Sequence, residues 1–245
     1  MKRPNEKVPA KDMVLQKNDK SRRQFLKMGG LAVVGSSLLL YGCSNDDDNM
    51  GPQEVFDLGA GDVGILNYAY ALEQLEAAFY TQVLAGSYWA GANAEEKLIL
   101  EDLYKHEVIH REFFKAAIGA AAPSNQVLPT LEFDFSSVNF GNRASVLGTA
   151  RVLEDTGVAA YNGAGSLLEN PTYLVLAGKI VSVEARHAAA IRSLLLQDPK
   201  AFAGDDIIDS NGLDLAKSPS MILQEVTATG FVKTPFTANN LPSGS

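Results

Sequence analysis

The stretch EDLYKHEVIHREFF, Glu101–Phe114, carries the residues that decide the fold. Within it, Glu107 and His110 form a Glu-x-x-His pair. Residues three apart lie on one face of an α-helix, so both side chains can reach one metal ion. A second pair, Glu184 and His187, lies in VEARHAAAIRSLLL. Because the chain has only three histidines, two of them in this pattern on long helical stretches are a strong signal.

Both pairs interrupt an apolar stripe whose residues recur in alternating steps of three and four. The stripes are Leu100, Leu103, Glu107, His110, Phe114, Ala117 and Ala177, Ile180, Glu184, His187, Ile191, Leu194. Such a stripe is the face that a helix buries in a bundle. A carboxylate buried there without a partner is costly, and a metal ion shared between helices would compensate it.

Two further stretches carry a glutamate on the apolar stripe but no histidine. LNYAYALEQLEAAFY places Glu73 and Glu76 on its stripe, and SVLGTARVLEDTGVAAYNGAG places Glu154 there. A tyrosine follows seven residues later in each case, Tyr80 after Glu73 and Tyr161 after Glu154. The order Glu, Glu-x-x-His, Glu, Glu-x-x-His indicates a duplicated helix pair.

This order resembles the ferritin-like superfamily, whose four-helix bundles hold two iron or manganese ions between such residues. The resemblance extends over roughly residues 60–198, and the chain is similar to bacterial ferritin-like proteins related to plant desiccation-related proteins. It implies an all-α fold of two antiparallel helix pairs joined by a long crossover. It also implies the metal ligands Glu73, Glu107, His110, Glu154, Glu184 and His187.

The ligand from the first helix could be either Glu73 or Glu76. Glu73 is favoured because it shares with Glu154 the tyrosine seven residues later and has an asparagine, Asn67, six residues earlier. In the duplication, Glu76 corresponds to Gly157. Glu76 is therefore expected beside the metals, as a neighbouring or mobile group.

The remaining polar residues near the stripes have simpler interpretations. Tyr80 and Tyr161 are either ordinary core tyrosines or groups that hydrogen-bond the ligating carboxylates. Lys105, His106 and Arg111 are expected on the solvated surface of their helix.

Capping and breaking residues predict the limits of the helices. The four helices are expected near residues 62–85, 94–118, 143–168 and 171–197. Asp62 should cap the first helix, Gly86 and Gly119 should end the first two, and Asn170-Pro171 should begin the fourth.

The crossover is expected in residues 120–142, where prolines and the alternating string LEFDF argue against a helix. The bundle domain should therefore occupy residues 60–198, and residues 199–245 form a tail. Within the tail, one short packing helix is expected at 219–227, and we find no chemistry there.

Residues 1–42 resemble an export signal. Ser21–Lys27 is similar to a twin-arginine motif, and the apolar run Met28–Tyr41 is short for a membrane span. Cys43 follows in a lipobox-like context, which implies its lipidation, and residues 43–59 would be an acidic tether. The resemblance implies export and lipid anchoring in the cell envelope, periplasmic or surface-exposed; an uncleaved transmembrane anchor is the alternative.

Charge and cysteine content limit the partners. Without the 9 basic and 3 acidic residues of its leader, the chain keeps 12 basic and 26 acidic residues, a net charge near −14. Nucleic acid and anionic membrane surfaces are therefore expected to be poor electrostatic partners of the chain, whereas cations suit it. A single cysteine excludes disulfides within the chain and a thiolate metal site.

The resemblance implies two metal ions, iron first and manganese second, because carboxylate and imidazole ligands suit both. Such a centre supports iron oxidation or peroxide- and oxygen-linked redox chemistry, with ferroxidase, peroxidase, manganese-catalase and oxygenase activities all open. The alternative is a non-catalytic envelope protein of stress or desiccation tolerance, whose metal is structural or absent.

Overall fold

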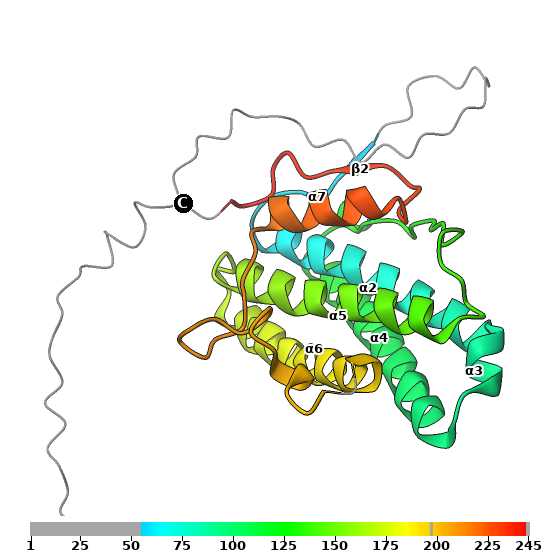
Figure 1. Ribbon diagram of the computed structural model, residues 1–245. Helices are drawn as coiled ribbons and strands as arrows, with labels where there is room; N and C mark the ends of the chain where they lie inside the picture. The colour runs from blue at the N-terminus through cyan, green and yellow to red at the C-terminus, as the bar shows by residue number, and fades with distance from the viewer. Residues whose placement is uncertain (1–54, 197, 244–245) are drawn as a thin grey trace, which may run out of the picture. The chain divides into compact units, whose positions relative to one another are not determined.

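Four long helices account for most of the computed structural model, which describes residues 55–196 and 198–243 (Figure 1). They are α2 (Gly61–Ala85), α4 (Ala94–Ala121), α5 (Arg143–Gly165) and α6 (Pro171–Leu196). The shorter elements are α3 (Ser87–Gly91), η1 (Ser124–Gln126), η2 (Ala201–Ala203), α7 (Pro219–Thr229), β1 (Phe56–Asp57) and β2 (Phe236–Thr237). The predicted leader, Cys43 and most of the tether lie outside the described residues.

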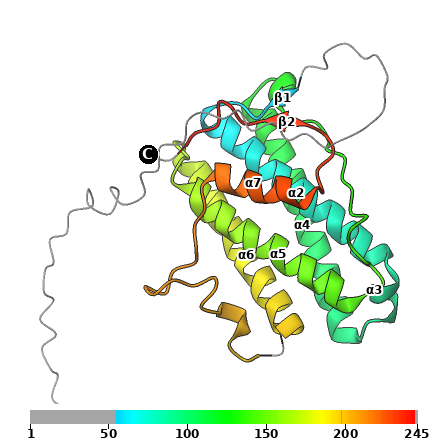
Figure 2. The same cartoon turned by 45° about the horizontal axis from the view of Figure 1, so that its top comes forward.

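The long helices pack as two pairs. α2 packs chiefly against α4 and α5 against α6, while further contacts join α2 to α5 and α4 to α6 (Figure 2). Within each pair a short connection makes the helices antiparallel. The crossover between α4 and α5 then joins the pairs, so the predicted all-α bundle of two antiparallel helix pairs joined by a long crossover is confirmed. In the described part of the chain, no helix combines the length and apolarity needed to span a bilayer.

The predicted cap of the first helix is wrong. α2 begins at Gly61, and Asp62 lies inside its first turn. The carboxylate of Asp62 instead accepts hydrogen bonds from the backbone N–H groups of Glu169 and Asn170, at 2.7 and 2.9 Å. It thereby ties the start of α2 to the connection between α5 and α6, a partner that lies more than a hundred residues away in sequence.

Glycine ended only one of the first two helices. α4 runs through Gly119 to Ala121, just ahead of Pro123, so the predicted end at Gly119 is wrong. α2 does end before Gly86, but the φ of Gly86 is −78°, which any residue can adopt. Glycine is needed at this position because a Cβ atom would lie 2.6 Å from the carbonyl oxygen of Phe140.

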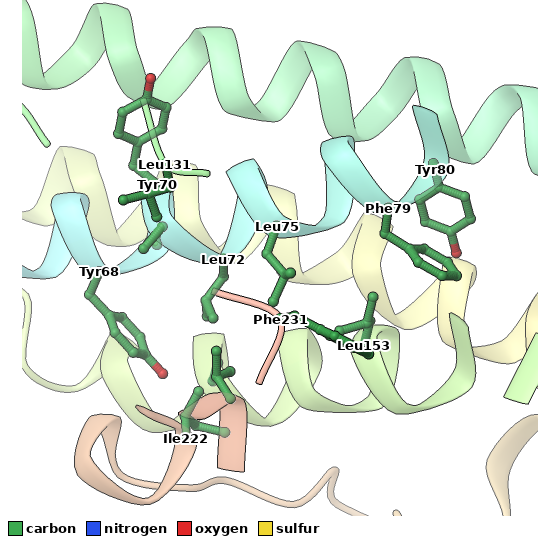
Figure 3. Close-up of a cluster of buried hydrophobic side chains, with 14 of the residues drawn as sticks. Tyr68, Tyr70, Leu72, Leu75, Phe79, Tyr80, Leu131, Leu153, Ile222 and Phe231 are labelled. Atoms are coloured by element: carbon green, nitrogen blue, oxygen red, sulfur yellow. The ribbon is translucent and has the colours of Figure 1, made fainter. Parts of the chain in front are cut away.

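The crossover and the tail complete the core on the outer side of α2 and α5. Phe135 of the crossover packs against Phe79 of α2 and Phe231 of the tail, with ring centroids 5.9 and 5.1 Å apart. Ile222 of α7 is fully buried, and it lies with Tyr68 of α2 between α2, α5 and α7 (Figure 3). The short tail helix predicted from the sequence is therefore present and packs on the bundle.

We expect Gly163→Ala to destabilise the protein by about 1–3 kcal/mol, the usual cost of overpacking. A Cβ atom on Gly163 would lie 1.7 Å from the carbonyl oxygen of Lys217. The backbone of the tail at Lys217 would therefore have to move away from α5. Gly148→Ala in the same helix is the control, because no atom of the described chain outside its own helix backbone and immediate neighbours lies within 4 Å of that Cβ position. Urea unfolding should show destabilisation in the first variant only; equal stabilities would contradict the contact.

Candidate metal centre

The six residues predicted as ligands meet in the middle of the bundle. α2 supplies Glu73, α5 supplies Glu154, and the Glu-x-x-His pairs come from α4 and α6. The four glutamates, Glu73, Glu107, Glu154 and Glu184, have no exposed surface, and His110 and His187 are buried. Helical spacing places each pair on one face, and packing of the two helix pairs turns all four faces toward one another.

The first half of the site surrounds His110. Its Nδ1 atom lies 2.8 Å from Glu184 Oε1, 3.4 Å from Glu73 Oε2 and 3.6 Å from Glu107 Oε2. These four residues offer ligand atoms that all lie within 4.8 Å of one another. This half is therefore large enough for one cation with nitrogen and oxygen ligands.

The second half surrounds His187 in the same manner. Its Nδ1 atom lies 2.8 Å from Glu107 Oε1, 3.4 Å from Glu154 Oε2 and 3.4 Å from Glu184 Oε2. Glu107 and Glu184 thus present one oxygen to each half. That arrangement suits two carboxylates that bridge a pair of cations.

The donor atoms of this cluster fit metal ions better than they fit one another. Eight buried atoms of the cluster have no hydrogen-bond partner among the described residues: Glu73 Oε2, both oxygens of Glu107 and of Glu184, Glu154 Oε2, and Nδ1 of His110 and His187. Among themselves these atoms meet only in close ion-pair contacts, the shortest 2.8 Å from each Nδ1 atom to a carboxylate oxygen. Since unpaired buried polar atoms are costly, cations at this point would supply the missing partners. The cluster is compatible with a metal site.

Without a metal, burial favours the protonated form of several carboxyl groups. It raises the pKa of Glu154 to about 8, against the opposing effect of His187. Burial also raises the pKa of Glu73 and of Glu76 well above the ordinary value, and the neighbouring carboxylates, first among them Glu184 for Glu73 and Glu107 for Glu76, add to this effect. In the metal-free protein, protons on these carboxyl groups thus neutralise negative charge that bound cations would otherwise neutralise.

The histidines compensate the rest of the negative charge. Burial opposes a charge on His110, but contacts with Glu107, Glu184 and Glu73 raise its pKa to about 12. The pKa of His187 is raised in the same way by its carboxylate contacts. Both imidazoles in turn hold the pKa of Glu107 at about 2, despite its burial. A metal ion must therefore displace protons from these groups.

The two tyrosines hydrogen-bond the glutamates in a crossed arrangement. Tyr80 of α2 donates to Glu154 Oε1 of α5 at 2.5 Å, and Tyr161 of α5 donates to Glu73 Oε1 of α2. Burial raises the pKa of both hydroxyl groups, so they stay protonated donors. Each tyrosine leaves the second carboxylate oxygen of its glutamate turned to the site.

Glu73 brings its carboxylate into the cluster, whereas Glu76 lies beside it. Glu76 is buried, and a Cβ atom on Gly157 would lie 3.2 Å from its Oε1 atom. The glycine at the position related by duplication therefore leaves room for the extra carboxyl group.

His106 is exposed, as predicted, but the sequence did not indicate its contact with the cluster. Its Nδ1 atom lies 2.9 Å from His187 Nε2, and the two ring planes are nearly parallel, with centroids 5.1 Å apart. The helical register places His106 off the buried face of α4, and only the packing of α6 against α4 brings His187 to it. Lys105 is at the surface as predicted, in an ion pair with Glu101.

We expect the metal-free protein to lose stability as the pH rises from 5 to 8. The folded-state pKa of Glu154, about 8, exceeds its ordinary value of 4.5. The contribution of protonated Glu154 to the free energy of unfolding is therefore complete below pH 4.5. It is lost as the pH rises through 8. His110, raised from 6.5 to about 12, acts with the same sign above pH 6.5.

Thermal unfolding after chelation tests this. The Tm should fall by several degrees between pH 5 and 8, and Glu154→Gln, which stays neutral, should fall less. Glu132→Gln, on an exposed residue of the crossover, is the control and should behave like the unchanged protein. An equal pH dependence in all three proteins would contradict the assignment.

Comparison with known families agrees with this architecture. The family model of the ferritin-like domain matches residues 61–197, which include α2, α4, α5 and α6. No curated protein matches the chain. Since the match covers more than half of the 245 residues, the chain belongs to the ferritin-like domain family.

Proposed function

We propose that the protein binds two iron or manganese ions and uses them in redox chemistry, either iron oxidation or reactions of oxygen or peroxide. The observation that carries this proposal is the cluster of eight possible metal-ligand atoms without hydrogen-bond partners. They are divided between two matching half-sites. Carboxylate and imidazole donors without thiolate suit both metals.

Each residue has a defined part in this proposal. Glu73 and His110 would hold one ion, Glu154 and His187 the other, and Glu107 and Glu184 would bridge them. Such a metal pair would pass electrons to oxygen or peroxide and would take them up from Fe(II) or from a second peroxide. Tyr80 and Tyr161 fix Glu154 and Glu73 by hydrogen bonds. The helices around the centre exclude bulk water from the four glutamates.

A structural metal site is the second candidate. The complete burial of Glu73, Glu107, Glu154 and Glu184 favours it, because structural metal sites are closed to solvent. A structural metal site would suit a non-catalytic stress protein related to the desiccation-related proteins. Turnover separates the two functions: a redox centre should cycle with Fe(II) and oxygen or with peroxide, whereas a structural metal should only raise the Tm.

Metal analysis of the purified full chain tests the site. We expect about two iron or manganese ions per chain, and almost none in Glu107→Gln/Glu184→Gln, which removes both bridging charges but keeps the side-chain volume. Glu101→Gln on the outer face of α4 is the matched control. Failure of the unchanged protein to take up either metal after reconstitution would overturn the proposal.

We also propose that the protein is exported by the twin-arginine route and anchored in the cell envelope through a lipid on Cys43. The leader motif and the lipobox-like context of the only cysteine support this. Cys43→Ser should abolish metabolic labelling with a fatty-acid analogue and should move the protein from the membrane fraction to the soluble fraction. Labelling that persists in the variant would contradict the anchor.

A further inference from the structure

The two halves of the metal centre are close copies of each other. The Nδ1 atom of His110 lies 2.8 Å from Glu184, and that of His187 lies 2.8 Å from Glu107. The distances to the terminal glutamates also match: 3.4 Å from His110 to Glu73 and 3.4 Å from His187 to Glu154. The two half-sites therefore offer matching inner ligand atoms to two ions.

His106 breaks this symmetry. It directly precedes Glu107, and the residue at the same place before Glu184 is Val183. The Nδ1 atom of His106 lies 2.9 Å from the outer ring nitrogen, Nε2, of His187. A valine side chain has no polar atom, so Val183 cannot supply the corresponding contact to His110.

The contact fixes the form of His187 that binds a metal. Because its Nδ1 atom faces the carboxylates, a neutral imidazole bound through Nδ1 carries its proton on Nε2. That N–H points to Nδ1 of His106, which then accepts the hydrogen bond. A partner of this kind holds the tautomer and ring orientation of a metal-ligating histidine and makes it a better donor. The two ring planes are nearly parallel, 8° apart, an orientation that suits a hydrogen bond in the plane of both rings.

We infer that His106 is a positioning residue for His187 and that it makes the metal position of His187 and Glu154 the tighter of the two. The inference rests on the proposed two-metal function. It assigns a role to the one histidine of this chain that lies outside both Glu-x-x-His pairs.

Equilibrium titration with Mn(II), followed by the electron paramagnetic resonance of the free ion, tests the inference on the full chain. The unchanged protein should bind about two ions in two steps. His106→Ala should weaken the tighter step about 10- to 100-fold, the usual effect of removing the partner of a ligating histidine. His106→Gln, whose side-chain oxygen can still accept the bond, should recover much of that loss.

Two controls separate positioning from general damage. Lys105→Ala, on the neighbouring exposed residue, should leave both steps unchanged. The Tm of the metal-free His106→Ala protein should match that of the unchanged protein, because His106 is exposed. Two binding steps that His106→Ala leaves intact would overturn the inference and leave the proposed function standing. No Mn(II) or iron binding by the unchanged protein would overturn both.

Discussion

Burial of four carboxylates around two imidazoles is the constraint on which the structure depends. Glu73, Glu107, Glu154 and Glu184 have no contact with solvent, and a group of buried negative charges is stable only with compensation. Protons on the histidines and on some carboxyl groups provide it without metal, and cations would provide it when bound. The helices must hold these groups at fixed positions in either state, which requires a rigid bundle.

Helix α2 gives that rigidity because both of its faces are buried. One face presents Glu73 to the centre, and the other holds the irregular segments. Asn67 donates to the carbonyl oxygens of Leu58 and Gln126 and accepts from the N–H of Leu128. Gln74 binds the backbone of Pro129 and Leu131. These amide side chains satisfy crossover groups that would otherwise be buried without partners.

The crossed tyrosines join the two helix pairs at the level of the carboxylate and histidine cluster. Tyr80 reaches from α2 to Glu154, and Tyr161 reaches from α5 to Glu73. Each bond links a residue of one sequence repeat to a residue of the other. The cluster is therefore shared by both helix pairs, and the contact of His106 with His187 makes its two halves unequal.

The sequence by itself determined the four helices and the residues at their centre, because helical periodicity is local and spacing alone places Glu107 and His110 on one face. It also indicated Glu73 over Glu76. The sequence did not predict contacts between distant segments. For example, Asp62 binds the connection before α6 instead of capping α2. Likewise His106, off the buried face of α4, meets His187 only because α6 packs beside it. Tertiary structure decided these points, since no local pattern records which surface residue a neighbouring helix will cover.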